Sequence, residues 1–599
     1  MAPDQTVPQI KKLNMKLYNY IAALGVALMS MGCKDYYNNE KDPIIYGDTY
    51  YISQIQTDKA VYKPGETVRI SIGEIPDGDI WVRYSHLGVI LAEEPLSTQY
   101  WSWTPPNVDF RGYLIEVYRA VIGKREVLHT IAVDVSSDWT KFPRYGFLSS
   151  FGNLSDYSIE SNIKALNRYH INGIQFYDWM YDHHKPLAGT VNKPDKQWPD
   201  LIGRTNYLST VQTYINKAKD RGMKTMFYNL AFGALKSAAL DGVKEEWYLF
   251  KDEFHSKKDL HLLNAPFRSS IYLTNPGNTE WQEYLASRHS DVYKVFGFDG
   301  YHIDQLGNRG NVYTYNGTPV DLTIAYGSFL QAMKNTNPEK RLVMNAVSQF
   351  GQQQSVARAD VDFLYTEVWD EAKTYNDLAS VILQNNLFSE NKKQTVLAAY
   401  MNYAKSNQSG FVNLPGVLLT NAVIFSFGGA HLELGEHYLA NEYFPNSNLQ
   451  LKSAAKAQLT AYYDFLVGYQ NLLRDGGTFE PFQVQSPQET LSFNNLANAQ
   501  GAIAVVGKTF AQRDVVHLIN FTTATSMEWR DTNATQPEPQ LIDSPTVNIN
   551  VQKTVSRVWF ASPDYLGGSA QELDFSQQGQ NLLITLPLLK YWSMVVIEY

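Results

Sequence analysis

Between residues 140 and 475 the chain alternates short apolar runs with stretches of helical spacing, and this alternation strongly constrains the fold. The runs are YGFLSSF, GIQFYDW, KTMFYNL, GYHIDQL, RLVMNAV, DFLYTEVW, TVLAAYM and either AVIFSFG or AHLELG. Strands that alternate with helices form parallel sheets, and eight of them fit a closed (β/α)8 TIM barrel over 140–477. A doubly wound open sheet is the alternative, although no G-x-G-x-x-G follows a strand. The stretch 232–275 predicts an insertion after the third strand.

The regions on either side of the predicted barrel have the period-two pattern of β-strands. Residues 49–136 contain runs such as TVRISIGEI and IWVRYSHLG with turn residues between them, and AVYKPGETVRI resembles the opening strands of immunoglobulin-like modules. Residues 478–599 contain AIAVVGKTF, DVVHLINF and SMVVIEY. The sequence therefore predicts a multidomain chain, in which a central barrel is flanked by an N-terminal immunoglobulin-like β-sandwich and a C-terminal antiparallel β-sandwich.

The segment 1–33 is typical of a targeting sequence. Lys11, Lys12 and Lys16 precede the apolar run YIAALGVALMSMG, which is too short to span a bilayer and ends before Cys33. Cys33 is the only cysteine, so the chain cannot form an internal disulfide or a zinc–thiolate cluster. The segment resembles the lipobox of bacterial lipoproteins, and KDYYNNE resembles the surface-export tag of gram-negative lipoproteins. The alternative is an unmodified, buried cysteine.

This resemblance predicts a lipoprotein signal segment over 1–33, lipidation of Cys33 and a tether over 34–48. The protein would then be a surface-exposed outer-membrane lipoprotein of a gram-negative bacterium, attached to the membrane by its lipid alone. The net charge of −9 argues against nucleic acid as a partner, because nucleic acids are bound through clustered Lys and Arg. The 40 Tyr, 28 Phe and 12 Trp suit stacking on sugar rings, or a large core rich in strands.

Two of the eight apolar runs end in a carboxylate. GYHIDQLG ends at Asp304, with His302 on the same face, and DFLYTEVW ends at Glu367, with Tyr365 on its face. Barrel enzymes carry their chemistry where strands end, and two carboxylates that converge on one cleft are the minimal apparatus of a glycosidase. One must be ionised to attack or stabilise the anomeric carbon, and the other must carry a proton.

Both assignments have structural alternatives. An Asp at a strand end also caps helices, and Glu367 before Trp369 fits an ordinary ion pair. The other carboxylates that fit a cleft are Asp178, Asp299, Asp362, Asp370, Glu371 and Glu433.

The motifs FDGYHIDQLG, DFLYTEVW, YDWMYDHHKPL and TNAVIFSFGGAHLELGEH together resemble glycoside hydrolase family 66, the dextranases and cycloisomaltooligosaccharide glucanotransferases. The resemblance implies that Asp304 is the nucleophile and Glu367 the acid/base. It implies retaining endo-hydrolysis of α-1,6-glucosidic linkages, with dextran and isomaltooligosaccharides as partners and with no cofactor and no metal. The cyclising transferases use the same residues but carry a large carbohydrate-binding insertion near the end of the barrel, and no insertion of that size lies between 400 and 475. A surface lipoprotein that binds glycan without cutting it is the non-enzymatic alternative.

Further residues near the predicted strand ends are candidates for substrate binding. Asp178 and His183 suit sugar hydroxyls, and Trp179 suits a stacking wall or simple packing. His431 and Glu433 have a spacing that fits a metal, but two ligands alone favour a structural or sugar-contact role. The predicted substrate-binding set is Asp178, Trp179, Tyr181, His183, Tyr228, Asn229, His302, Gln305, Asn345, Trp369, His431 and Glu433.

Overall fold

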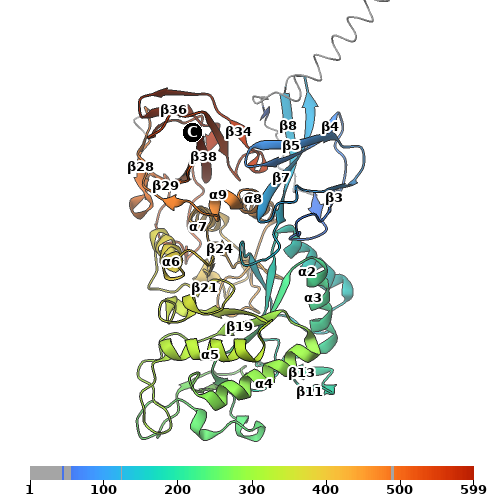
Figure 1. Ribbon diagram of the computed structural model, residues 1–599, viewed down its shortest axis with the longest axis vertical. Helices are drawn as coiled ribbons and strands as arrows, with labels where there is room; N and C mark the ends of the chain where they lie inside the picture. The colour runs from blue at the N-terminus through green and yellow to red at the C-terminus, as the bar shows by residue number, and fades with distance from the viewer. Residues whose placement is uncertain (1–43, 46–54, 123, 488–490) are drawn as a thin grey trace, which may run out of the picture.

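The computed structural model describes residues 44–45, 55–122, 124–487 and 491–599. Cys33, the predicted signal segment 1–33 and all of the predicted tether 34–48 except residues 44 and 45 lie outside these ranges. In the described part no helix is long and apolar enough to cross a membrane. Figure 1 shows three regions in chain order, which are an N-terminal β region, a central barrel and a C-terminal β region.

The predicted central barrel is present as an eight-stranded parallel sheet. Its strands in chain order are β9 (Tyr145–Leu148), β10 (Gly173–Phe176), β15 (Lys224–Leu230), β19 (Gly300–Asp304), β20 (Arg341–Asn345), β21 (Leu364–Glu367), β22 (Thr395–Ala398) and β24 (Ala430–His431). Each strand pairs with its neighbours in this order. The seam between first and last strands is held by one parallel bridge, in which the Phe147 N–H donates to Leu434 O at 3.3 Å. The barrel is therefore nearly closed.

Helices follow seven of the eight strands. They are α2 (Asp156–Arg168), α3 (Leu208–Asp220), α4 (Thr279–Phe296), α5 (Leu322–Thr336), α6 (Tyr375–Phe388), α7 (Leu414–Ser426) and α8 (Ser453–Gly468), and the short α9 (Gln470–Leu473) follows α8. The fully described connection 346–363 has only two 3-10 turns, Val347–Gln349 and Val356–Arg358, in place of the expected helix. Ser348, Gln349 and Gly351 all have positive φ there, which an α-helix does not allow.

The structure shows which of the two candidate runs in the sequence forms the eighth strand. AHLELG supplies β24, whereas AVIFSFG lies in α7 and is not a strand. Every residue of α7 from Gly416 to Ser426 is buried, so the helix has no polar face to reveal its period. A continuous apolar run of this kind does not distinguish a buried strand from a buried helix.

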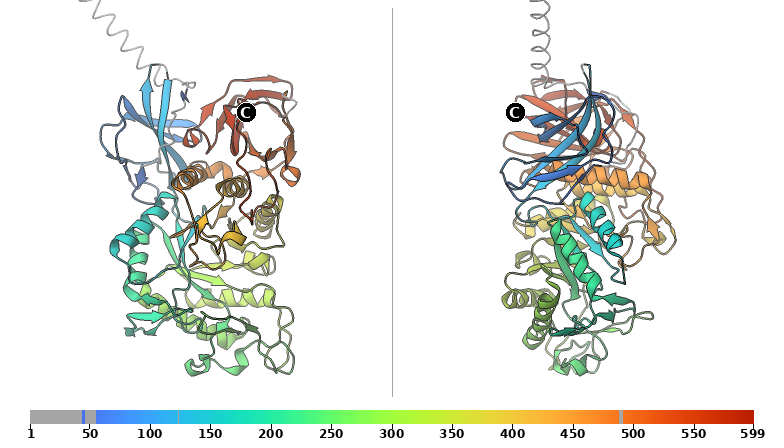
Figure 2. Two further views of the ribbon diagram at one scale, coloured as in Figure 1. Left: turned by 180° about the vertical axis from the view of Figure 1, so that it is seen from behind. Right: turned by 90° about the vertical axis from the view of Figure 1, so that its right-hand side faces the viewer.

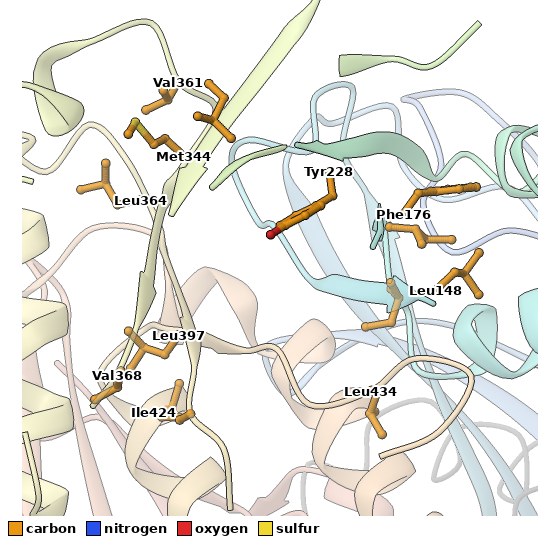
Figure 3. Close-up of a cluster of buried hydrophobic side chains, with 14 of the residues drawn as sticks. Leu148, Phe176, Tyr228, Met344, Val361, Leu364, Val368, Leu397, Ile424 and Leu434 are labelled. Atoms are coloured by element: carbon orange, nitrogen blue, oxygen red, sulfur yellow. The ribbon is translucent and has the colours of Figure 1, made fainter. Parts of the chain in front are cut away.

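Alternate residues of the barrel strands contribute to two different cores. Side chains such as Phe176, Met344 and Leu364 pack outward against the helices. Figure 3 shows Phe176 and Leu364 pointing away from the space between the strands and Tyr228 pointing into it. The barrel interior is filled by Trp139, Tyr145, Phe147, Met226, Val343, Phe363, Tyr365, Val396, Ala398, Ala430 and Leu432. The inward positions near the carboxyl ends of the strands are polar, and they form the site described below.

Two sheets form the N-terminal region. One contains β1 (Ile44–Ile45), β8 (Lys124–Val135), β7 (Arg111–Val121), β4 (Ile80–His86) and β5 (Val89–Pro95), and the other β2 (Gln56–Thr57), β3 (Val68–Ser71) and β6 (Tyr100–Trp103). Val68 and Ile70 from the smaller sheet share one apolar cluster with Val82 and Ile115 from the larger. The sheets therefore pack face to face, and membership of the immunoglobulin class stays a prediction.

The C-terminal region also has two sheets that share an apolar cluster. The larger contains β26 (Thr478–Phe479), β28 (Phe493–Asn495), β29 (Ile503–Thr509), β30 (Arg513–Asn520), β33 (Arg557–Ala561), β34 (Gln571–Glu572) and β38 (Trp592–Glu598). The smaller contains β27 (Val484–Gln485), β32 (Thr546–Asn550), β35 (Phe575–Gln578) and β36 (Asn581–Thr585). Pairing is antiparallel as expected, except that β28 runs parallel to β29.

The two β regions lie side by side at one end of the molecule (Figure 1, Figure 2), where Arg557 Nη2 donates to Gly88 O at 3.0 Å. The predicted insertion after the third barrel strand forms a small antiparallel sheet of β16 (Gly233–Ala234), β17 (Leu260–His261) and β18 (Ile271–Leu273). The remaining short pairs are β11 (Gly189–Thr190) with β12 (Lys193–Pro194), β13 (Gln197–Pro199) with β14 (Thr205–Tyr207), β23 (Gly410–Phe411) with β25 (Leu449–Gln450), and β31 (Ile542–Asp543) with β37 (Leu588–Leu589).

Candidate active site

Asp304 and Glu367 stand at the carboxyl ends of the fourth and sixth barrel strands, where the sequence predicts them. The register of the sheet explains why both side chains face inward. His302 and Tyr365 belong to the interior layer, and Asp304 and Glu367 lie two residues further along the same strands. Both carboxylates border one cavity of about 500 Å³.

One side-chain amide connects the two carboxylates. Asn345 Nδ2, at the end of the fifth strand, donates to Asp304 Oδ1 at 2.8 Å and to Glu367 Oε2 at 3.0 Å. Because the two oxygens share one donor nitrogen, their separation cannot exceed the sum of these two distances. Asn345 Oδ1 in turn accepts from the Glu367 N–H at 3.2 Å, which fixes the orientation of the amide. The two acids thus converge on one place in the cleft.

Asp304 is held by three donors. The Tyr228 hydroxyl donates to Oδ2 at 2.8 Å, and the Gln305 N–H and Asn345 Nδ2 donate to Oδ1 at 2.9 and 2.8 Å. Burial raises the pKa of Asp304, whereas these hydrogen bonds lower it because they favour the charged form. A carboxylate with both oxygens saturated by donors is suited to act in its ionised form.

At Glu367 the charge of a neighbouring carboxylate adds to the effect of burial. Burial and the neighbouring charge of Asp304 raise the pKa of Glu367 to about 7, against the hydrogen bonds that lower it. The Tyr400 hydroxyl donates to Oε1 at 2.7 Å. A carboxyl with a pKa near 7 carries a proton close to neutral pH and is suited to general acid catalysis.

The cavity around the two acids is mixed polar and aromatic. Its walls include nine of the predicted residues, which are Asp178, His183, Tyr228, His302, Asp304, Gln305, Asn345, Glu367 and Trp369. Residues that the sequence reasoning did not assign to the site also line it, among them Gln175, Tyr177, His261, Leu263, Phe267, Tyr365, Tyr400, Glu442, Tyr443 and Phe444. Among the described residues, no group of three or more His, Cys, Asp or Glu side chains is arranged to hold a metal ion.

His302 forms part of the cavity floor. Its ring stacks near Tyr145 and Tyr228 and meets Tyr365 edge-on, with ring centroids 5.7, 6.2 and 4.8 Å away. Burial lowers the pKa of His302 to about 3, so the imidazole is neutral at the pH of interest. His302 therefore contributes no charge to the site.

Asp178 and His183 reach the cavity from the connection after the second strand. Asp178 is buried with a left-handed φ of 51°, and burial together with the charge of Asp200 raises its pKa to about 7. The His183 imidazole is held by Asn229, whose Oδ1 lies 2.8 Å from Nδ1. Asn229 itself is buried behind His183 and His289, so the structure gives it a supporting place beside the cavity wall.

Four other predicted substrate contacts lie away from the cavity. Trp179 is fully buried among aromatic rings, and its indole N–H donates to Tyr228 O at 3.2 Å, so it packs and forms no stacking wall. The Tyr181 ring packs against the Arg268 guanidinium, with its centroid 5.3 Å from Arg268 Cζ. His431 and Glu433 are buried around the Asn421 amide, at 2.7 Å from it in each case, and stabilise the end of the eighth strand.

The cavity residues that the sequence did not predict lie either just beyond strand ends or in loops. Tyr177 and Tyr400 lie just beyond strand ends, so the rule that found Asp304 also applies to them. Glu442, Tyr443 and Phe444 belong to the loop after the eighth strand, and Phe444 stacks on Tyr177 with ring centroids 4.2 Å apart. His261, Leu263 and Phe267 come from the insertion. Loop residues of this kind have no periodic signal in the sequence.

Comparison with known proteins gives consistent matches. A cycloisomaltooligosaccharide glucanotransferase of Niallia circulans is 28% identical over 91% of this chain and 72% of its own length. A dextranase of Streptococcus salivarius is 24% identical over 78% of this chain and 65% of its own. The crystal structure of a Paenibacillus sp. cycloisomaltooligosaccharide glucanotransferase complexed with cycloisomaltoheptaose superposes with a TM-score of 0.84 at 25% identity, covering 92% of this chain and 100% of that chain. The model of glycosyl hydrolase family 66 matches residues 57–596, and the chain belongs to that family.

Proposed function

We propose that the protein is a retaining endo-dextranase, which hydrolyses α-1,6-glucosidic linkages in dextran and releases isomaltooligosaccharides. Asp304 is the nucleophile and Glu367 the general acid/base. The observation that carries the proposal is the Asn345 amide, whose Nδ2 lies 2.8 Å from one oxygen of Asp304 and 3.0 Å from one oxygen of Glu367. Retaining glycosidases have carboxyl groups about 5–5.5 Å apart, and inverting ones need roughly 6.5–9.5 Å to admit a water. The sum of the two Asn345 distances is the upper limit for the separation of that oxygen pair, and it falls short of the inverting range, which supports retention.

In the first step Asp304 attacks the anomeric carbon while Glu367 protonates the departing glucosyl oxygen. The three donors on Asp304 favour its ionised form against the effect of burial, and the raised pKa of Glu367 favours its protonated form near neutral pH. The bond from the anomeric carbon to the leaving oxygen breaks, and an ester between the glucosyl unit and Asp304 forms. Positive charge that develops at the sugar ring in this step is stabilised by the nearby Asp304 carboxylate.

In the second step water cleaves the ester. Esterification removes the negative charge of Asp304, which is one cause of the raised pKa of Glu367. The pKa of Glu367 therefore falls in the intermediate, and its carboxylate accepts a proton from the attacking water. The same residue acts first as acid and then as base because the charge of its neighbour changes between the steps.

Cyclisation by transglycosylation is the alternative for the same pair of acids, since two of the relatives above are named as cycloisomaltooligosaccharide glucanotransferases. The alignment with the Niallia circulans transferase extends over 713 residues, and this chain has 599, so the transferase contains at least 114 residues without a counterpart here (713 − 599). The large insertion expected of the cyclising transferases is not found between residues 400 and 475, and this favours release of the product to water.

Reducing-end release from dextran tests the proposal. We expect Asp304→Asn and Glu367→Gln to lower kcat by at least about 10³-fold, the loss expected when a nucleophile or acid/base is removed. Glu371→Gln is the matched control, because Glu371 lies in the loop that follows Glu367 and accepts a hydrogen bond from the Ser348 hydroxyl at 2.8 Å. Near wild-type turnover by either active-site variant contradicts that residue's role. A wild type that binds dextran and releases neither reducing ends nor cyclic products identifies a glycan-binding protein.

Two further measurements separate the remaining alternatives. Chromatography of the products distinguishes linear isomaltooligosaccharides, which we expect, from cyclic ones, which identify a transferase. Azide added to Glu367→Ala should restore turnover of an aryl isomaltoside, whose leaving group departs without a proton, and give a glycosyl azide, because a small nucleophile replaces the base-activated water. Rescue of Asp304→Ala by azide in place of Glu367→Ala would exchange the two roles.

We also propose that Cys33 carries a lipid that anchors the protein at the outer surface of a gram-negative cell. The support is the sequence Lys11 to Cys33, in which a basic stretch and a short apolar run precede the single cysteine. Labelling of cells with an alkyne fatty acid tests this. The label should enter the wild type and be lost in Cys33→Ser, and equal labelling of both contradicts the anchor.

A further inference from the structure

The connection between β30 and β31, residues 521–541, leaves the C-terminal sheet and packs on the barrel loops that follow β21 and β22. Four backbone hydrogen bonds fix it there, with the donor first: Tyr375 to Met527 at 3.0 Å, Trp529 to Lys373 at 3.2 Å, Asn402 to Arg530 at 2.8 Å and Ala404 to Thr532 at 3.1 Å. The Trp529 indole N–H also donates to Ala372 O. These two barrel loops carry Trp369 and Tyr400, so a segment from outside the barrel supports the wall of the active site.

Arg530 is the charged side chain at the centre of this contact. Its Nη2 donates to Val368 O at 3.0 Å, one residue beyond Glu367. Its Cζ lies 5.3 Å from the Trp369 ring centroid and 5.2 Å from that of Tyr403. The two rings are nearly perpendicular, at 81°. A planar guanidinium can contact two rings and donate to a carbonyl at once, which a lysine ammonium cannot reproduce.

Each of the two rings either lines the cavity or contacts a residue that lines it. Trp369 lines it, and its side chain is one of the groups that lower the pKa of Glu367. The Trp369 ring also lies beside that of Tyr400, whose hydroxyl donates to Glu367, with ring centroids 5.7 Å apart. The Tyr403 hydroxyl donates to the two oxygens of Glu442, at 2.9 and 2.8 Å, and Glu442 also lines the cavity. Arg530 therefore contacts two rings, and each of these rings neighbours a carboxyl group that lines the cleft, Glu367 or Glu442. Arg530 itself comes from the C-terminal region.

We propose that Arg530 is a positioning residue for the reaction, whose guanidinium holds the Trp369 and Tyr403 rings and through them orients Glu367 and Glu442. The inference rests on the role proposed above for Glu367. It differs from a general attachment of the C-terminal region, because the backbone hydrogen bonds already attach the 521–541 connection without the Arg530 side chain. The side chain adds the contact to the two rings.

Steady-state kinetics on dextran with Arg530→Ala test the inference. We expect kcat to fall about 10- to 100-fold with a smaller change in KM, the size of effect seen when a catalytic group is displaced by a fraction of an ångström or more. We also expect the basic limb of the pH–kcat profile to move to higher pH. Trp369 lowers the pKa of Glu367, so displacement of its side chain raises that pKa. Trp369→Phe, which keeps a ring but has no N–H, should move the limb in the same direction.

Two variants serve as controls. Arg530→Lys keeps the charge without the planar contact, and its kcat should lie between those of the wild type and Arg530→Ala. Lys553→Ala removes another cation that lies over an aromatic ring of the C-terminal region, at 4.9 Å from Tyr599, and should behave as wild type. Thermal unfolding of each variant reports whether the fold is intact.

The outcomes separate the inference from the proposed function. An active wild type with Arg530→Ala kinetics and pH profile unchanged overturns the inference and leaves the function standing. A lower kcat with an unmoved basic limb and a lower Tm also overturns it, because the side chain then only stabilises the fold. A wild type that releases no reducing ends from dextran fails at the proposed function, and the role of Arg530 falls with it.

Discussion

The Tyr228 hydroxyl donates to Asp304 Oδ2 at 2.8 Å, from a neighbouring strand of the barrel. The register of the sheet pairs Tyr228 with His302, so the tyrosine reaches one layer further along the barrel to meet the carboxylate. Tyr228 is therefore part of the environment that keeps the proposed nucleophile charged. This contact gives the first prediction.

Tyr228→Phe should move the acid limb of the pH profile of kcat/KM to higher pH. The hydrogen bond lowers the pKa of Asp304, so its removal raises that pKa, and a larger fraction of the enzyme is protonated and inactive at low pH. We expect a loss of about 10- to 100-fold in kcat. Tyr177→Phe is the control, since its hydroxyl donates to the Glu442 carbonyl at 3.3 Å. An acid limb that is the same in both variants and the wild type contradicts the prediction.

Activity should fall as the pH rises above about 7, because the acid form of Glu367 is then lost. Tyr400→Phe should move this basic limb to higher pH, since the Tyr400 hydroxyl lowers the pKa of Glu367 through its bond to Oε1. The measurement is the dependence of kcat/KM on pH across the neutral range. A basic limb that moves to lower pH would falsify the assignment of Glu367 as the acid.

Asn345→Ala should lower kcat about 10²- to 10³-fold, because it removes a donor from both acids and leaves their separation unconstrained. Asn345→Asp keeps the shape but adds a carboxylate between Asp304 and Glu367. It should raise the pKa of Glu367 further and lower the rate at least as much. The comparison of the two variants is made by kcat on dextran. An Asn345→Asp enzyme more active than Asn345→Ala argues against an electrostatic role for the amide.

Glu367→Gln should make the folded protein more stable at pH 8 and leave its stability nearly unchanged at pH 4. A carboxyl whose folded pKa is raised binds its proton more tightly in the folded state, so the free energy of unfolding falls as the pH rises from the unfolded pKa to the folded one. For a rise from about 4.5 to about 7 the effect is on the order of 3 kcal/mol. Thermal unfolding at the two pH values checks this. An equal change in Tm at both pH values would show that ionisation of Glu367 does not destabilise the folded protein.

The alternation of apolar runs and helices predicted the barrel because each strand has its own local signal, and the two acids followed from the rule that chemistry lies at strand ends. Trp179 shows where this rule stops. Continued alternation after Gln175 and Tyr177 places Trp179 inward, but Asp178 has a left-handed backbone and turns the next side chain into the core. The sequence also did not predict Glu442 or Arg530, because loops that meet across the fold leave no periodic pattern.

The 521–541 connection has a consequence for engineering. A catalytic unit that ended at the last barrel helix would lose the backbone hydrogen bonds and the Arg530 contact that this connection makes to the loops after β21 and β22. The barrel is therefore not a portable module that can be moved between scaffolds. Under the proposed role of Arg530, a transplanted version has to bring with it a C-terminal partner that presents a guanidinium at the same place.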